Sequence, residues 1–328
     1  MITRMRGLPR SLRWTPRAPR PAAPAPAPEA LLDEALLGRL RAIQIDLRNL
    51  PTHGLAGEHR SRQRGPSPEF SDFRPYSIGD DFRRIDWNAY ARFDELFIRE
   101  SETTTEIDVH VLLDLGPTMA WTSDDRLPTK GRYGLRLTAA LGYLSLWHLD
   151  RFSVRPLGVG GPMFGPIQGR SAILPMLHYL QRLPAGEPVD PVAALTQYIW
   201  HRRPGSLLVI SDFVHTDPAP LEAVLRTARG RGWRVRLLHI QDPAEADPGE
   251  WLVRDEVTEL VESGSKARLT VRANPRTRQA YLADRQAWLD GLGAVATQHG
   301  ILHDVITTDE AIDDVIIATF GVPGAVRR

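Results

Sequence analysis

The chain has 328 residues, with 41 Lys and Arg against 40 Asp and Glu, and it contains no cysteine. The length suffices for one large domain or two ordinary ones, and 42% hydrophobic residues is typical of a globular protein. The lack of cysteine excludes disulfides, thiolate metal sites and a cysteine nucleophile. A formal charge of +1 gives no overall attraction to nucleic acid or to a membrane.

The first 28 residues differ from the rest, because they hold six arginines, seven prolines and no acidic residue. Alternating Pro and Ala favours extended, solvated chain, so we expect a disordered basic arm. The arm is interpreted as a linker, as the product of an early start codon or as a tether to something anionic. It carries +6, so the remaining 35 basic and 40 acidic residues leave the body at −5. No signal peptide and no span of about 20 apolar residues is found, which predicts a cytoplasmic protein without a membrane span.

Leucines at spacings of three to four residues predict an amphipathic helix within 29–50. The segment 53–106 is irregular, with a short strand beginning near 96–99. Strand and helix patterns then alternate. Strands are predicted over 107–114, 151–158, 207–211, 234–240 and 302–306, and a hairpin over 257–261 and 267–271. Helices are predicted over 130–148, 171–182, 191–201, 219–229, 275–298 and 310–320.

Continuous apolar strands between helices predict an α/β fold, with a doubly wound, mostly parallel sheet covered by helices on both faces. The predicted organisation is the arm over 1–28, an N-terminal helix with an irregular segment over 29–105, and the α/β domain over 106–328. Two of the predicted strands end in an acid, at Asp114 and at Asp212. Because such sheets bind ligands beyond the carboxyl ends of their strands, we expect these two carboxylates to lie close together.

Three other sequence patterns give weaker evidence about function. A glycine-rich stretch follows the strand at 151–158, but Pro162 and Pro166 interrupt it, which indicates a flexible loop rather than a phosphate cradle. His299 and His303 are four residues apart across Gly300, and a two-histidine metal site there is disfavoured. Most tryptophans lie within or beside apolar patterns and are interpreted as core packing rather than as base-stacking platforms. This group comprises Trp121, Trp147, Trp200, Trp233, Trp251 and Trp288.

The segment 69–92 reads EFSDFRPYSIGDDFRRIDWNAYAR. It resembles the signature of the DUF58 family of prokaryotic proteins of unknown function, and with the downstream pattern the resemblance covers about 54–320. The residues that carry it include Glu69, Arg74, Tyr76, Gly79, Asp80, Arg83, Asp86, Trp87 and Arg92. Their physical role stays open between bidentate Arg–carboxylate pairs that fix irregular chain, a recognition surface, and an acid–base pair.

The resemblance implies a domain similar to von Willebrand factor A (vWA) domains and a MoxR-type AAA+ ATPase as partner. In vWA domains, a strand-end Asp and two hydroxyl residues of the same loop hold a divalent cation, together with a hydroxyl residue of a second loop and an Asp of a third. The matching positions here predict a degenerate site with Asp114, Thr118 and Asp212 as ligands and Mg²⁺ or another divalent cation as the ion. Gly116 replaces one hydroxyl and Asp190 stands where a second is expected. Without metal, the facing aspartates need a cation or donors nearby, for which Lys130 and Arg132 are candidates.

These observations favour a non-enzymatic interaction or scaffold protein that works with a MoxR-type AAA+ ATPase in the assembly or maturation of a client protein. One alternative is a metal-dependent hydrolase-like enzyme that uses the strand-end aspartates. A second alternative is nucleic-acid binding through the basic arm, which would require a strong dependence of binding on salt.

Overall fold

The computed structural model describes residues 30–43, 69–76, 85–93, 95–102, 107–214, 216–249, 256–261 and 268–321. Contacts within the chain define two units, residues 1–55 together with 107–328, and residues 56–106. The predicted arm over 1–28 lies outside the described residues, as do Gly79, Asp80 and Arg83 of the signature and Trp251.

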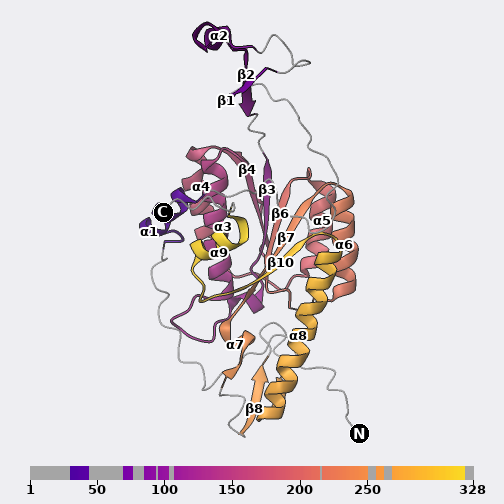
Figure 1. The fold of residues 1–328 in the computed structure, drawn as a ribbon. Helices are drawn as coiled ribbons and strands as arrows, with labels where there is room; N and C mark the ends of the chain where they lie inside the picture. Colours follow the sequence, from indigo (N-terminus) through magenta and orange to yellow (C-terminus); the bar gives the residue numbers. More distant parts are fainter. Residues whose placement is uncertain are drawn as a thin grey trace. The chain divides into compact units, whose positions relative to one another are not determined.

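The larger unit is built on a six-stranded sheet of order β10-β7-β6-β3-β4-β5 (Figure 1). Its strands are β3 Asp108–Asp114, β4 Arg151–Leu157, β5 Phe164–Gln168, β6 Ser206–Ser211, β7 Arg234–Gln241 and β10 Leu302–Thr307. All neighbours are parallel except β5, which pairs antiparallel with β4 at the edge. The predicted α/β fold with a mostly parallel sheet is confirmed, whereas β5 was not predicted because Gly165 and Pro166 interrupt its short pattern.

Helices cover both faces of this sheet (Figure 1). One face carries α1 Glu34–Ala42, α3 Lys130–Trp147, α4 Ile173–Gln181 and α9 Ile312–Phe320. The other face carries α5 Pro191–His201, α6 Pro218–Gly230 and α8 Pro275–Gln298. Short helices are η2 Pro117–Ala120, η3 Arg170–Ala172 and α7 Pro243–Ala246. The predicted hairpin is also confirmed, as β8 Glu256–Val261 paired antiparallel with β9 Arg268–Ala273.

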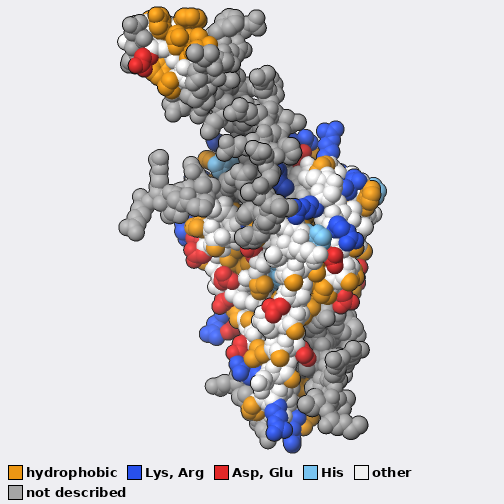
Figure 2. Space-filling model, turned by 45° about the vertical axis from the view of Figure 1, so that its right-hand side comes forward, with side chains coloured by type: hydrophobic (Ala, Val, Ile, Leu, Met, Phe, Trp, Pro, Cys, Tyr) orange, Lys and Arg blue, Asp and Glu red, His pale blue; other side chains and the backbone are white. Residues whose placement is uncertain are grey.

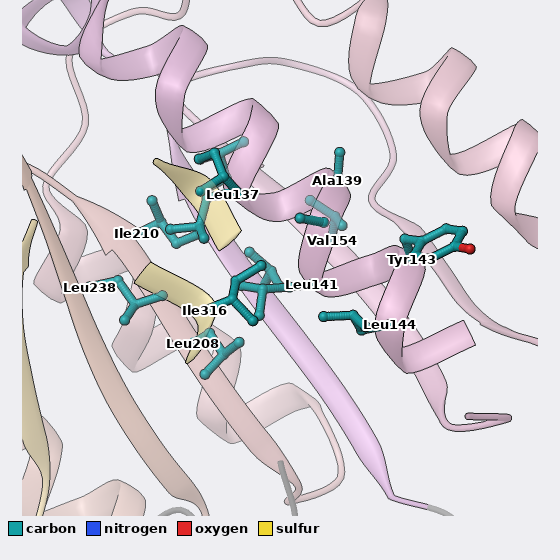
Figure 3. Packing of buried hydrophobic residues seen from close by; sticks show 14 of the residues in the cluster. Leu137, Ala139, Leu141, Tyr143, Leu144, Val154, Leu208, Ile210, Leu238 and Ile316 are labelled. Carbon is teal, nitrogen blue, oxygen red and sulfur yellow. The ribbon is translucent and has the colours of Figure 1, made fainter. Parts of the chain in front are cut away.

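The core on the first face is centred on α3. Thr129 caps the helix by accepting a hydrogen bond from the Arg132 backbone N–H at 3.1 Å. The apolar side chains of α3 then contact residues of the central strands and of α9 (Figure 3). The labelled contacts are Leu137, Leu141 and Leu144 of α3 with Val154, Leu208, Ile210, Leu238 and Ile316. Burial of this kind stabilises a fold by about 25 cal/mol per Å² of apolar surface.

The N-terminal helix is shorter than its leucine pattern predicted. Asp33 caps α1 by accepting from the Leu36 N–H at 2.7 Å, and the helix ends before Ile43, after which residues 44–68 lie outside the described part of the chain. Leu36 and Leu40 are buried in the core of the larger unit. Arg41 also donates to the Tyr143 hydroxyl at 2.9 Å. These contacts dock α1 against α3.

The smaller unit contains β1 Glu69–Pro75, α2 Trp87–Phe93 and β2 Phe97–Glu102. Strands β1 and β2 pair antiparallel with an irregularity between Phe70 and Asp72. The predicted strand near 96–99 is therefore present, and its partner is the first part of the signature segment.

The tryptophans that were assigned to the core differ in how far they are buried. Trp233 is buried in the core of the second face, as predicted. Trp200 is 56% exposed and lies 4.3 Å from the Arg231 guanidinium, so its assignment to the core was wrong. A cation over an aromatic ring at the surface explains this side chain better than packing does. Across the part of the chain that the structure describes, no helix combines the length and apolar character needed to cross a bilayer.

Gly142 of α3 offers a test of the core. A Cβ at this position would overlap Met176 Sδ and lie 2.7 Å from Phe152 Cε1, so we expect Gly142→Ala to lower the free energy of unfolding by about 1–3 kcal/mol. The matched control is Gly38→Ala in α1, where nothing lies within 4 Å of the new methyl group and a gain of about 0.5–1 kcal/mol is expected. Urea unfolding of both variants measures the difference, and equal stabilities would contradict this packing.

Candidate functional site

The carboxyl ends of β3 and β6 form the switch point of the sheet. Strand β3 pairs with β4 on one side and with β6 on the other, so the connections that follow these strands leave in opposite directions. Asp114 ends β3, and Asp212 follows the last residue of β6. Both are buried, and Asp114 is only 4% exposed. The predicted meeting of two strand-end carboxylates is therefore what the fold produces.

An ammonium group lies at this switch point. Lys130 is the first residue of α3, and its side chain is 1% exposed. Its Nζ donates to Asp212 Oδ2 at 2.8 Å and to Glu245 Oε1 at 2.6 Å, and it lies 5.9 Å from the Trp121 ring centroid. A lysine is almost never this deeply buried unless it is paired. Of the two cations that the sequence offered, Lys130 is the one that meets the aspartates.

Asp114 is held by neutral donors on both of its oxygens. Oδ2 accepts from the Ser211 hydroxyl at 2.6 Å, and Oδ1 accepts from the Gly116 backbone N–H at 2.8 Å. Burial, together with the nearby charge of Asp212, raises the pKa of Asp114 to about 6. Asp114 therefore keeps its proton to higher pH than an ordinary aspartate.

A third strand end contributes two acids that the sequence did not reveal. Asp242 follows β7 and caps α7, accepting from Ala244 N–H and from Ser123 N–H, both at 2.8 Å. Glu245 completes a capping box, because its Oε2 accepts from the Asp242 N–H at 2.9 Å while its Oε1 binds Lys130. The available signal was the string DPAE directly after an apolar strand, which is a helix-start pattern. We call Asp114, Lys130, Asp212, Asp242 and Glu245 the Lys130 cluster.

Burial and the neighbouring charges shift the pKa values of Lys130 and Glu245 in opposite directions. Burial alone would lower the pKa of Lys130, but the carboxylates of Asp212 and Glu245 outweigh it and the pKa is raised. Burial raises the pKa of Glu245, against the attraction of Lys130. Lys130 is therefore a fixed positive charge over the whole physiological range. It also lies at the positive end of the α3 dipole, which increases its need for carboxylate partners.

The side chains as they stand do not fit a divalent cation. The Lys130 ammonium lies within 2.8 Å of the Asp212 oxygen that a metal would need, and Asp114 directs both oxygens at protein donors. Gly116 supplies no oxygen ligand, and among the described residues no group of three or more His, Asp and Glu is arranged to hold a metal ion. A cation could enter only if the ammonium left.

The other predicted ligands lie apart from these contacts. Thr118 is half-buried in η2, and no hydrogen bond within the described part of the chain joins its side chain to the cluster. Asp190 is exposed and caps α5, accepting from the Val192 N–H at 2.9 Å. In the described structure Asp212 is paired with Lys130, and the predicted ligand set stays a prediction.

The described signature residues lie in the smaller unit. Glu69 and Arg74 belong to β1, and the Tyr76 backbone N–H donates to Leu96 O at 2.7 Å. Asp86 is buried and accepts from the Ala89 N–H at 3.1 Å, so it begins α2. Trp87 and Arg92 of α2 are exposed. These positions show a structural role for Asp86 and a surface position for Trp87.

The arrangement joins three strand ends to the start of α3 and has little access to solvent. All five members of the cluster are buried, and each makes at least one hydrogen bond within the protein. A general acid or base must reach its substrate directly or through one water molecule. The geometry therefore supports a structural role for the cluster. The ion pairs of Lys130 with Asp212 and Glu245 hold the start of α3 against the ends of β6 and β7, and we call this arrangement the electrostatic lock.

Replacing the ammonium tests this lock. Lys130→Met leaves Asp212 and Glu245 buried without a counter-charge, so we expect a loss of about 3–5 kcal/mol in unfolding free energy at pH 7. The loss should be smaller at pH 5 than at pH 7, because burial raises the pKa of Glu245 and so favours its neutral form as the pH falls. Arg126→Met is the control, since the Arg126–Asp124 pair is exposed and its loss should cost less than about 1 kcal/mol. Chemical denaturation at both pH values measures this, and equal losses in the two variants would refute the lock.

The raised pKa of Asp114 predicts that the stability of the wild-type protein also depends on pH. Its native pKa of about 6 lies above the ordinary value of 3.8, so the native state holds the proton longer and stability falls by about 3 kcal/mol as pH rises from 4 to 6. We expect Asp114→Asn to remove this slope and to stabilise the protein by about 1–3 kcal/mol at pH 7. Asp284→Asn, on the exposed surface of α8, should match the wild type. A less stable Asp114→Asn variant at pH 7 would mean that a cation compensates this carboxylate.

Comparison with known proteins places these features in a family. An uncharacterized protein of Mycobacterium bovis, Mb1516, is 24% identical over 268 residues, which cover 79% of this chain and 83% of the relative. An uncharacterized protein of Mycobacterium tuberculosis, Rv1480, matches with the same identity and coverage. The family model described as protein of unknown function DUF58 matches residues 72–288, which include the described signature residues from Arg74 onward and the whole Lys130 cluster. The chain therefore belongs to the DUF58 family.

Proposed function

We propose that this protein is a non-enzymatic interaction or scaffold protein with a vWA-like domain, and that it works with a MoxR-type AAA+ ATPase on a client protein. The Lys130 cluster carries this proposal. The polar groups at the switch point, where an α/β protein usually binds its ligand, are turned inward and paired with one another. What remains available to other molecules is surface rather than a reactive centre.

The smaller unit supplies such a surface. Trp87 is 63% exposed on α2, and its ring contacts that of Tyr90 edge-on, with centroids 6.2 Å apart. Large exposed aromatic side chains are common at the energetic centres of protein interfaces. Because Trp87 belongs to the residues of the family signature and both rings are exposed, recognition is a stronger explanation for this pair than core packing is.

The hydrolase alternative requires open carboxylates and a bound metal. The pairing of Asp212 with Lys130 argues against both. Nucleic-acid binding through the arm concerns residues outside the described part of the chain and stays a prediction. Calorimetry with millimolar Mg²⁺ and Mn²⁺ separates the hydrolase alternative from the proposal, because a metal-dependent enzyme has to bind its ion.

The proposal predicts metal-independent association. We expect the full chain to capture a purified MoxR-type ATPase, encoded beside a member of this family, equally well with Mg²⁺ or with a chelator. Asp114→Asn should behave like the wild type, because Asp114 holds no ion.

Trp87→Ala with Tyr90→Ala should reduce capture at least about tenfold, which corresponds to 1.4 kcal/mol. Trp200→Ala, which removes an exposed tryptophan of the other unit, is the control. Loss of capture with the chelator would overturn metal independence, and absence of capture would overturn the partner assignment.

A further inference from the structure

A groove of about 440 Å³ runs between α5 and strand β4, on the face opposite α3. From α5 it is lined by Ala194, Tyr198 and His201, which share one side of the helix because they are four and three residues apart. Arg155 of β4 lines the opposite wall. The volume is within the range of about 300–1,000 Å³ that is typical of ligand sites.

The groove is positively charged. Arg155 and Arg202 both line it, whereas Asp and Glu are absent from the lining residues that the structure describes. Neither arginine forms an ion pair with a carboxylate in the described part of the chain, although Arg155 Nη1 donates to Gly161 O at 3.1 Å. Figure 2 shows Lys and Arg side chains together with histidines over the upper part of the face that α5 and α6 bring forward. Two guanidinium groups without carboxylate partners suit an anionic ligand, which they can hold by paired hydrogen bonds.

The floor of the groove is rigid. The Tyr198 hydroxyl lies 2.9 Å from His110 Nδ1, which is also 3.0 Å from the Ser153 hydroxyl. His110 and Ser153 are buried on the central strands β3 and β4, so they fix the tyrosine ring beside the groove. Burial also lowers the pKa of His110 to about 4, and its ring adds no charge at pH 7. Tyr198 is 7% exposed, so it gives the groove a fixed aromatic edge between the two arginines.

One end of the groove is fastened to the switch point. Gly158, with φ of 74°, lies so close to Glu187 O that a Cβ would overlap it, and it accepts a hydrogen bond from the Glu187 N–H at 2.7 Å. The next link is Gly186 N–H, which donates to Leu115 O at 2.7 Å, one residue after Asp114. The glycine-rich stretch was predicted to be a flexible loop. Its first residue, Gly158, instead holds one end of the groove in place through its hydrogen bond with Glu187.

The dimensions favour a chain over a compact molecule. Lining residues extend from Val189, just before α5, to Arg202, just after it, and the eleven residues of α5 are about 16 Å long. An extended peptide covers this length with about five residues. Arginine, tyrosine and methionine, all present in the lining, are also enriched in protein interfaces.

We propose that this groove binds an extended acidic segment of a protein partner, whose carboxylates pair with Arg155 and Arg202 while an apolar side chain contacts Tyr198. The inference rests on the proposed interaction function, for which it names the surface and the chemistry of the bound segment. It involves α5 and β4 and is separate from the aromatic surface of α2.

The test uses the full chain and a fluorescein-labelled peptide of eight residues with alternating glutamate and leucine and blocked termini. We expect saturable binding that weakens with added salt, because exposed charge pairs are screened. Arg155→Gln with Arg202→Gln should weaken it at least about tenfold. Arg226→Gln with Arg276→Gln removes two exposed positive charges elsewhere and should leave it unchanged. Thermal unfolding of each variant verifies that it is folded.

The inference would be overturned by the absence of saturable binding, by equal affinity for a peptide with glutamine in place of glutamate, or by equal binding by the Arg155/Arg202 variant. Displacement of the peptide by inorganic phosphate at low millimolar concentration would also overturn it, in favour of a small-anion site. Capture of the ATPase in the absence of peptide binding would overturn the groove proposal and leave the proposed ATPase partner in place. Peptide binding in the absence of ATPase capture would overturn the proposed ATPase partner and leave the groove proposal in place.

Discussion

A buried ammonium group sets the constraint on which this fold depends. Lys130 cannot be hydrated where it lies, so the loops that end β6 and β7 must present carboxylates to it. Burying such a pair gains little net free energy, whereas removing one partner is costly. The value of the cluster is therefore in specificity. It favours one arrangement of α3 and α7 around the carboxyl ends of the sheet, in which the Lys130 ammonium has two carboxylate partners.

A lysine and a divalent cation solve the same electrostatic problem at this position, with different consequences. Both neutralise carboxylates gathered at strand ends. A metal ion keeps coordination positions that water or a partner's carboxylate can take. An ammonium on a covalent tether offers only hydrogen bonds, and here Asp212 and Glu245 receive them. If partner binding is the activity of this domain, recognition has to use other surfaces, and the groove beside α5 offers the unpaired positive charge that the switch point lacks.

The sequence predicted most of the fold and three of the five members of the Lys130 cluster, Asp114, Lys130 and Asp212. The strands at 107–114 and 207–211 are apolar runs that end in an acid, and parallel pairing makes those acids meet. Lys130 could be named because two facing aspartates need a cation. Glu245 was missed because its string reads as an ordinary helix cap, and only tertiary structure turns its second oxygen toward Lys130. Edge strand β5 was missed because its pairing with β4 tolerates Gly165 and Pro166. Trp200 was misplaced because an apolar residue on a helix need not face the core.

The switch point and the groove are linked by a short chain of hydrogen bonds. Asp114 accepts from the Gly116 N–H, Leu115 O accepts from Gly186, and Glu187 donates to Gly158 at the end of the groove. Glycine is required along this path, because a Cβ at Gly158 would overlap the Glu187 carbonyl oxygen and one at Gly186 would lie 2.9 Å from Gly158. These bonds join the loop that follows Asp114 to one wall of the groove. Interiors packed this closely transmit strain rather than absorb it. The loop that follows Asp114 and the glycine end of the groove are thus connected by backbone hydrogen bonds, whereas the side chains of the Lys130 cluster point into the protein.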